Sequence, residues 1–501
     1  MTNGASVTMH MSSLRTDIVS MGGARVLDYL IQMLLPIFLA RIFAPAEYGQ
    51  YRLLWLVVTT SMIFSIMYMP QGLYYFLPHG RTRSEQSQHV SNCLGFLFLS
   101  GSVIALLALV ATTWQGVVSP ISDNAMLLPG MVLLTTMTSL LDFLPGADHR
   151  VREQAGLLIG LSLLRAGLLI GIALSTRDID MVFASLILFA TIKMAVLLVY
   201  INRRHSSIGL GLSAGKLLEQ LRYSLPFGVA GGLHQLRLQL DQWMAALMFT
   251  PAEYAAFTCG IYVAPIMNVV RDSIATAALP RLMRLHADVD GGSTQVLELF
   301  RKINTATSLA IMPLLTWLFV YADVIVELIF TSSYSAGANV MRMYVLGFVV
   351  LTMETNSLLR VYCAGRITMS MDAMLLPVTV VSSYLGARLL GLEGAALGAV
   401  GCIWIGEITK FHFVSRLIRV PATALIDWRS CLVIIIGSVL GGALAYSFRE
   451  NAVTTVIDLL TQVTAGGIVI LVTAIAILCL TRPAVVKGCF GIPLVRTRHA
   501  E

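Results

Sequence analysis

The chain has 501 residues, of which 57% are hydrophobic and only 12% are charged. Soluble globular domains carry about 25% charged residues, so this composition excludes that class and indicates an all-α polytopic membrane protein. The net charge of +7 does not indicate a nucleic-acid partner, because the basic residues lie between apolar segments, where they set membrane orientation.

About fourteen segments are apolar and long enough to cross a membrane as helices, which takes about 20 residues each. The connections between them are short, so no soluble catalytic or nucleotide-binding domain fits between two spans. The seven cysteines form no CxxC pair, and no metal site is predicted. The predicted spans lie near 18–43, 51–78, 90–118, 125–147, 155–175, 181–201, 223–249, 254–280, 303–323, 336–363, 368–390, 394–418, 431–448 and 461–481.

The basic residues fall mainly in alternate connections, which places both termini and the 202–222 connection in the cytoplasm. The opposite side holds only five of them, Arg41, Arg52, Arg177, Arg388 and Arg449. The most basic internal connection divides the chain into related halves. The predicted domains are an N-terminal lobe (1–201), a linker (202–222), a C-terminal lobe (223–419), an additional helix pair (420–481) and a tail (482–501).

The first span carries a narrow polar face. At 100° per residue, Arg25, Asp28, Tyr29, Gln32 and Pro36 fall within about 100° of arc. Charged side chains inside a membrane normally face a bundle interior or a water-filled cavity. We therefore expect this face to line a cavity and to oppose the seventh span.

A short motif follows the first span and recurs after the seventh. FAPAEYGQY at 43–51 and FTPAEYAAF at 249–257 share Pro-Ala-Glu-Tyr, and each opens the next span. Because six spans separate the copies, they indicate parallel repeats related by an axis along the membrane normal.

The seventh span is the most polar. One arc of about 200° holds six polar side chains, interrupted only by Leu238. Polar contacts that only hold neighbouring helices together need fewer polar side chains than this. The pattern therefore favours a helix that lines a polar chamber over one that is simply packed in a bundle. The six are His234, Gln235, Arg237, Gln239, Asp241 and Gln242.

Other charges within spans include Arg165 and Arg271, for which snorkelling to a span end is a poor explanation. Glu407 and Lys410 are expected to form a local pair. GxxxG patterns at 156–160, 167–171, 228–232 and 437–441 predict close helix contacts.

The segment from YSLPFGVAGG to PRLMRLH, at 223–286, resembles the second-half signature of Wzx-like polysaccharide-unit flippases of the MOP exporter superfamily. The shared elements are Ser-Leu-Pro at 224–226, Asp241, Tyr262 and Pro280. RIFAPAEYGQY is similar to the first-half signature, although Ala255 and Ala256 replace the glycine that the family usually carries in the second copy.

The resemblance implies two six-helix lobes around a central cavity, as in MATE and other MOP proteins, with a trailing helix pair. It also implies a flippase, not an enzyme, of the bacterial cytoplasmic (inner) membrane that moves an undecaprenyl-diphosphate-linked oligosaccharide. The surface polysaccharide it serves would be an O-antigen (lipopolysaccharide), a capsule or an exopolysaccharide. Polysaccharide polymerases and glycosyltransferases are possible partners besides membrane lipids. No cofactor is expected apart from H⁺ or Na⁺ coupling.

On this hypothesis arginines bind the diphosphate, glutamines bind sugar hydroxyls, and two aspartates pair with arginines in the empty cavity or bind the coupling ion. A MATE-like cation-coupled antiporter and, from a different class, a membrane glycan polymerase or ligase are the alternatives. The first prefers an acidic cavity, and the second needs a long outside loop. The candidate binding residues are Arg25, Arg165, Gln235, Arg237, Gln239 and Arg271, and the candidate switch residues are Asp28 and Asp241.

Overall fold

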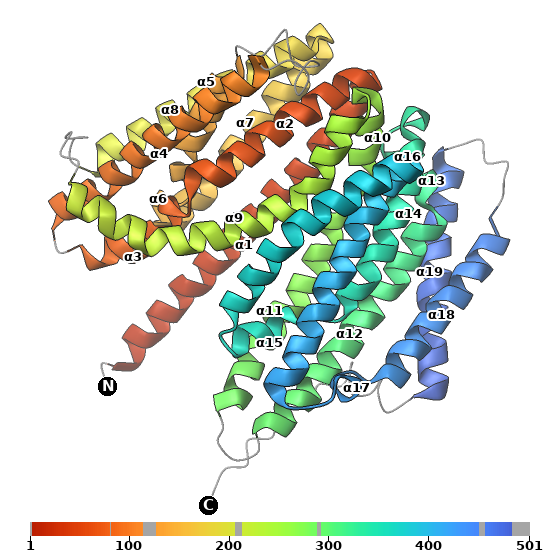
Figure 1. Ribbon diagram of the computed structural model, residues 1–501. Coiled ribbons are helices and arrows are strands. Elements are labelled where there is room, and N and C mark those ends of the chain that lie inside the picture. Colours follow the sequence, from red (N-terminus) through yellow and green to blue (C-terminus); the bar gives the residue numbers. More distant parts are fainter. Residues whose placement is uncertain are drawn as a thin grey trace, which may run out of the picture. The chain divides into compact units, whose positions relative to one another are not determined.

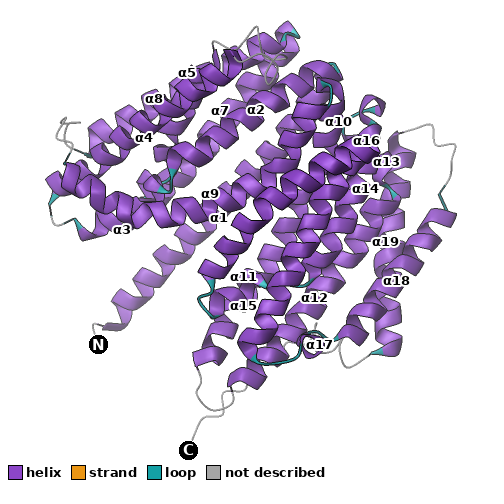
Figure 2. Ribbon diagram, viewed as in Figure 1, coloured by secondary structure: helices purple, strands orange, loops and turns teal. Residues whose placement is uncertain are grey.

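The computed structural model describes residues 3–80, 82–113, 127–205, 213–287, 292–449 and 456–482. Within these ranges the secondary structure is helical, with short loops and no strand (Figure 2). The predicted all-α class is therefore confirmed.

The chain forms two compact units, and the helix α9 (Ala214–Met248) begins in the first and ends in the second (Figure 1). The first comprises Met1–Gln239 and Thr250–Ala255, and the second Leu240–Phe249 and Ala256–Glu501. The predicted linker lies before this division, its residues 206–212 are outside the described ranges, and the predicted domain boundaries stay a prediction.

The elements before α9 are α1 (Asn3–Ile42), α2 (Pro45–Ile66), α3 (Met69–His79), α4 (Arg83–Thr113), α5 (Leu127–Thr138), η2 (Ser139–Asp142), α6 (Leu144–Ala147), α7 (Val151–Thr176) and α8 (Ile179–Arg204). Those after it are α10 (Pro251–Ile261), α11 (Ala264–Ala287), α12 (Gly292–Val320), α13 (Ala322–Ile329), η3 (Ser332–Tyr334), α14 (Ala336–Phe348), η4 (Val349–Thr352), α15 (Asn356–Val361), α16 (Gly365–Ile418), α17 (Ala422–Leu425), α18 (Trp428–Ser447) and α19 (Val456–Thr481).

Each predicted span has a helical counterpart in the described ranges. Eleven helices there are long and apolar enough to cross a membrane, and α14 with η4 forms a shorter apolar segment. The 54-residue α16 bends at Gly391, whose φ of 66° and ψ of −143° are left-handed backbone that glycine tolerates, so it supplies two spans. The polar α9 supplies the remaining one.

The repeated Pro-Ala-Glu-Tyr motif builds the same helix start twice. Glu47 accepts a hydrogen bond from the backbone N–H of Ala44 at 3.0 Å, and Glu253 accepts one from Thr250 at 2.9 Å. Each glutamate thus satisfies a free N–H at the start of α2 or α10. Gly49 is needed where the two copies meet, because a Cβ there would lie 1.9 Å from the carbonyl oxygen of Pro251.

The C-terminal helices α18 and α19 pack through one GxxxG pattern, where Gly437 and Gly441 meet the backbones of Ala474 and Ile470. At the end of this pair Asp427 accepts hydrogen bonds from Ser430 and pairs with Arg482 at 3.1 Å. Partial burial alone would raise the pKa of Asp427, but the Ser430 hydrogen bonds and the Arg482 charge outweigh it and hold the pKa below its ordinary value.

The other GxxxG predictions have mixed outcomes. Gly228 lies against the backbone of Met67, so that pattern marks a close contact. The two patterns on α7 do not, because a Cβ on any of their four glycines would meet nothing within 4 Å among the described residues.

Candidate functional site

A cavity of about 530 Å³ lies within the first unit, between α1, α2, α5, α7 and α8. Five charged side chains line it: Arg25 and Asp28 from α1, Asp142 from η2, Arg165 from α7 and Lys193 from α8. Three cations against two carboxylates leave these five groups with a net positive charge. The structure therefore brings three of the eight candidate residues into one chamber.

Both carboxylates of this cavity have partners. Asp142 pairs with the Lys193 ammonium at 2.8 Å. Asp28 accepts hydrogen bonds from Gln32 Nε2 at 2.9 Å and from the Ser162 hydroxyl, so α1 is tied to α7. In this structure the partners of Asp28 are thus neutral groups and not the arginines expected from the sequence.

The two cavity arginines have no carboxylate within ion-pair distance among the described residues. The Arg165 guanidinium lies over the Trp55 ring, with its central carbon 4.5 Å from the ring centroid. The Nε atom of Arg165 is buried and has no hydrogen-bond partner among the described residues. Arg25 is exposed on α1. These cations are therefore available to an anion that enters the cavity.

The polar face of α9 is linked to the cavity wall through Gln239. Its Oε1 accepts a hydrogen bond from Thr60 at 2.7 Å, and its Nε2 donates to Thr59 at 3.4 Å. Thr59 itself lines the cavity. Gln235 is exposed, and Arg237 is half-buried.

Asp241 is buried in the second unit, where it contacts α14. The Tyr344 hydroxyl donates to one carboxylate oxygen, and the backbone N–H of Gln242 donates to the other at 2.7 Å. The bond from Tyr344 connects the end of α9 to α14 within the second unit.

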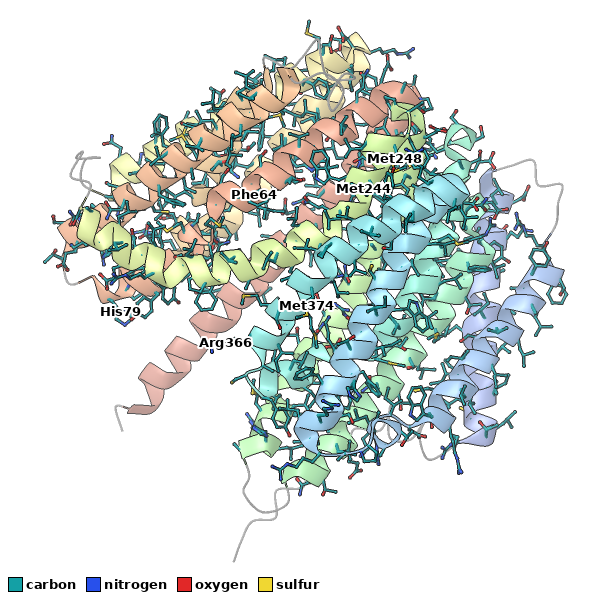
Figure 3. The ribbon with its side chains drawn as sticks, viewed as in Figure 1. Phe64, His79, Met244, Met248, Arg366 and Met374 are labelled. Atoms are coloured by element: carbon teal, nitrogen blue, oxygen red, sulfur yellow. The ribbon has the colours of Figure 1, made fainter. Side chains whose placement is uncertain are left out.

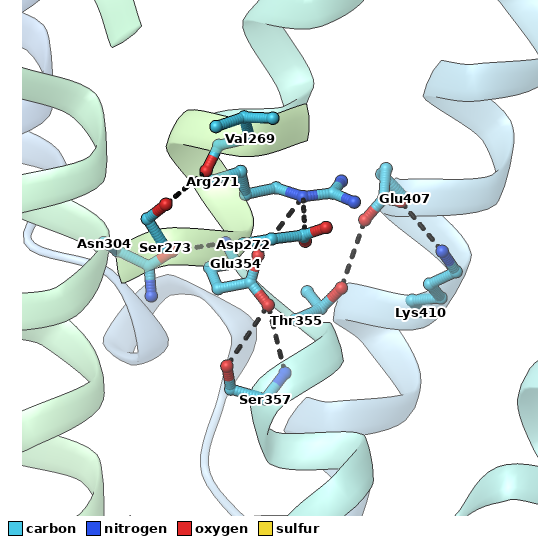
Figure 4. Close-up of polar contacts among 10 residues, drawn as sticks. All are labelled: Val269, Arg271, Asp272, Ser273, Asn304, Glu354, Thr355, Ser357, Glu407 and Lys410. Carbon is cyan, nitrogen blue, oxygen red and sulfur yellow. Dashed lines mark hydrogen bonds and ion pairs between the residues drawn. The ribbon is translucent and has the colours of Figure 1, made fainter. Parts of the chain in front are cut away.

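Arg271 lies in a buried polar network of the second unit (Figure 4). Its Nε is 3.5 Å from Glu354 and 3.7 Å from Asp272. Glu354 is 2% exposed and accepts hydrogen bonds from the N–H and hydroxyl of Ser357, while its own N–H donates to Asn304. The carboxylate therefore stabilises the break before α15 and gives Arg271 a partner within the protein.

The network continues to α16. Thr355, next to Glu354 in the chain, donates to Glu407 at 3.1 Å, and Lys410 pairs with Glu407 at 2.8 Å (Figure 4). The predicted local pair is confirmed. Both of its side chains are buried, so each charge needs the other.

Sequence reasoning missed Trp55, Asp142 and Tyr344. Asp142 had a usable signal, because it is the only charged residue within the predicted span at 125–147 and intramembrane carboxylates are functional candidates. The other two are aromatic residues within apolar stretches, and nothing in the pattern marks them.

The fold is similar to those of several solved transporter structures. The lipid II flippase MurJ, in an inward closed conformation, matches with a TM-score of 0.67 and 11% identity over 92% of this chain and 99% of that one. An inward-facing multidrug resistance MATE family transporter matches with a TM-score of 0.60 and 13% identity over 79% of this chain and 95% of that one. A MOP superfamily transporter from Pyrococcus furiosus, described as having a binding pocket of reverse polarity, matches with a TM-score of 0.52 and 13% sequence identity. The match covers 81% of this chain and 94% of that one.

No curated protein matches the sequence. A family model described as "Polysaccharide biosynthesis protein" matches residues 38–339, which is more than half of the chain. These residues include both copies of the Pro-Ala-Glu-Tyr motif, every candidate residue after Asp28, and all of α9. The chain therefore belongs to this family of polysaccharide biosynthesis proteins, with the fold that MurJ and the MATE transporters share.

Proposed function

We propose that this protein is a flippase that moves an undecaprenyl-diphosphate-linked oligosaccharide across the bacterial cytoplasmic membrane for assembly of a surface polysaccharide. The observation that carries the proposal is the net positive cavity of the first unit, in which Arg25 and Arg165 face the chamber without a carboxylate partner among the described residues. The family membership and the fold support the same activity.

A diphosphate suits this cavity for a physical reason. Guanidinium groups bind phosphate oxygens through two parallel N–H donors, and such charge-assisted bonds gain strength where water is scarce. In our proposal Arg25 and Arg165 bind the diphosphate, and Gln235 and Gln239 bind hydroxyl groups of the glycan. Arg237 and Arg271 are further contacts for the diphosphate along the transport path.

The direct test is transport in proteoliposomes. The purified protein should move a lipid-linked oligosaccharide between leaflets, and deletion of its gene in the host should accumulate the same lipid on the inner leaflet. Export of cationic drugs without lipid movement would favour the MATE-like alternative. The cavity charge argues against that alternative, because a cationic substrate would be repelled by the net positive chamber.

Orientation is tested separately. We expect both termini and the 202–222 connection to be cytoplasmic, because the basic residues gather on that side. An alkaline phosphatase fused after Glu501 should therefore be inactive. Strong phosphatase activity of that fusion would overturn the assignment of both ends.

Asp241 is proposed as the residue that resets the transport cycle or binds the coupling ion. Asp241→Asn keeps the shape and can still accept a hydrogen bond from Tyr344, but it removes the charge. We expect the variant to bind the lipid-linked oligosaccharide and to lose turnover in proteoliposomes.

The matched control for this switch is Tyr344→Phe, which removes the donor and leaves the carboxylate charge. It should keep measurable turnover. Near-normal turnover of Asp241→Asn would instead reduce Asp241 to a structural residue.

A further inference from the structure

Five aromatic rings contact one another in a row along α3 and the first half of α9. The centroid distances are 5.5 Å from Tyr68 to Phe227, 5.6 Å from Phe227 to Tyr223, 4.8 Å from Tyr223 to Tyr75, and 4.5 Å from Tyr75 to His79. The Tyr223 and Tyr75 rings are stacked, with 13° between their planes. We call these five side chains the aromatic ladder, and all of them belong to the first unit.

The ladder lies at the surface of its unit. Phe227 is 53% exposed, Tyr75 44% and Tyr68 39%, and His79, at the end of α3, is exposed as well (Figure 3). Behind it the Phe76 ring is buried and contacts Tyr75 and Tyr223. The ladder is therefore fixed from behind by the core and offers ring surface on its outer side.

Local backbone features hold these rings together. Met67 and Tyr68 have φ of 44° and 63°, a left-handed conformation that is an outlier for bulky residues. Strain of this kind persists at functional sites when the surroundings enforce it. Gly228 of α9 leaves room for this backbone, because a Cβ at that position would lie 2.6 Å from the Met67 backbone.

The two helices approach closely again one helical turn earlier in α9, where a Cβ on Gly72 of α3 would lie 2.5 Å from the Ser224 hydroxyl. Two glycines thus allow α3 and α9 to meet closely enough for rings from both helices to join in one ladder.

The ladder extends along the whole of α3. Tyr68 immediately precedes the first residue of this helix, and His79 is its last residue. The rings therefore form one continuous surface along α3 and not an isolated pair.

The ladder also differs in residue type from the exposed surface of α4. There Leu99, Leu106 and Leu107 are exposed and aliphatic, and the exposed ring of Phe98 has no polar tip. Tyrosine combines an apolar ring with a polar tip, which suits a ligand that has an apolar face and hydroxyl groups at its edge. A pyranose ring has this character, since its axial C–H bonds form an apolar face.

We propose that the aromatic ladder is a glycan-binding track, on which sugar rings of the lipid-linked oligosaccharide stack as they pass. This inference rests on the proposed flippase function and assigns the two parts of the substrate to different surfaces. The charged diphosphate binds the cationic cavity, and the uncharged sugars bind the ladder.

The test compares two lipids on purified full-length protein in nanodiscs. One is the host's lipid-linked oligosaccharide, and the other is undecaprenyl diphosphate, which has no sugar. Leucine at Tyr75 and Tyr223 removes the rings and keeps apolar bulk. Because aromatic contacts contribute modestly, affinity for the oligosaccharide lipid should fall about three- to tenfold per ring, while affinity for undecaprenyl diphosphate stays unchanged.

Two controls accompany the leucine variants. Tyr74→Leu alters a tyrosine that is also 44% exposed and adjacent to Tyr75, yet outside the ladder, so affinity for both lipids should be unchanged. Tyr75→Phe keeps the ring and should keep most of the affinity. If the double leucine variant does not fold, Tyr75→Leu alone carries the test, because its half-exposed side chain supports little of the core.

Each result decides the assignment. An equal loss of affinity for both lipids, or no loss for either in folded variants, would overturn the glycan-binding track and leave the proposed function intact. If the unmodified protein bound neither lipid, the proposed function would fail and the track with it.

Discussion

Arg165→Ala and Arg25→Ala are each expected to reduce lipid-linked oligosaccharide transport to background while the amount of folded protein is unchanged. Each charge-assisted hydrogen bond to a phosphate contributes about 1.5–3 kcal/mol, so losing one guanidinium weakens binding about tenfold to a hundredfold. Neither arginine forms an ion pair with a described carboxylate, so neither substitution leaves a described carboxylate without its cation. Removal should therefore affect the substrate and not the fold.

Lysine variants and a matched arginine refine this test. Arg165→Lys keeps the charge and loses the planar fork, so partial transport is expected. Arg388 provides the control, because its guanidinium also lies over an aromatic ring, that of Tyr384 at 5.5 Å, but outside the cavity. Normal transport by both alanine variants at native abundance, measured beside Arg388→Ala, would make the cavity arginines structural and remove the main support for a diphosphate substrate.

The sequence was sufficient for the helical class, the span positions and the repeated helix start, because each depends on residues close together in the chain. Apolar length predicts a span, and a glutamate three positions after the first residue of a turn predicts a cap. The cavity face of α1 was also predicted, since Arg25, Asp28 and Gln32 share one face of a single helix.

Pairings between helices were beyond the sequence. Asp241 meets Tyr344 across 103 positions, and Gln239 meets Thr60 across 179. Such contacts depend on how far each helix is rotated about its axis, and hydropathy does not determine that rotation for a helix with several polar residues. The GxxxG patterns of α7 illustrate the same limit, because small residues permit a close contact without choosing the partner.

The ion pair between Arg271 and Glu354 changes the expected effect of replacing Arg271. If Arg271 only bound substrate, Arg271→Ala would abolish transport at normal protein abundance. The structure places Glu354, 2% exposed, within 3.5 Å of Arg271. Removing one partner of a buried ion pair leaves an uncompensated charge and costs about 3–5 kcal/mol. We therefore expect Arg271→Ala to lose transport and folded protein together, so the single variant cannot separate a substrate role from a structural one.

The double variant Arg271→Ala with Glu354→Gln makes that separation. Glutamine can still accept the hydrogen bonds of Ser357, and it carries no charge that requires Arg271. Folded protein, measured by thermal unfolding and by abundance in the membrane, should return close to the unmodified level. Glu354→Gln alone should fold and transport, because Asp272 remains beside the guanidinium.

Transport by the double variant then decides the role of Arg271. If this arginine binds the diphosphate along the path, transport stays lost although the fold is restored, and this is the result we expect. If its task is to neutralise Glu354, neutralising Glu354 by mutation makes it dispensable and transport recovers. Recovery to near the unmodified rate would remove Arg271 from the binding residues and leave the cavity of the first unit, with Arg25 and Arg165, as the site for the diphosphate.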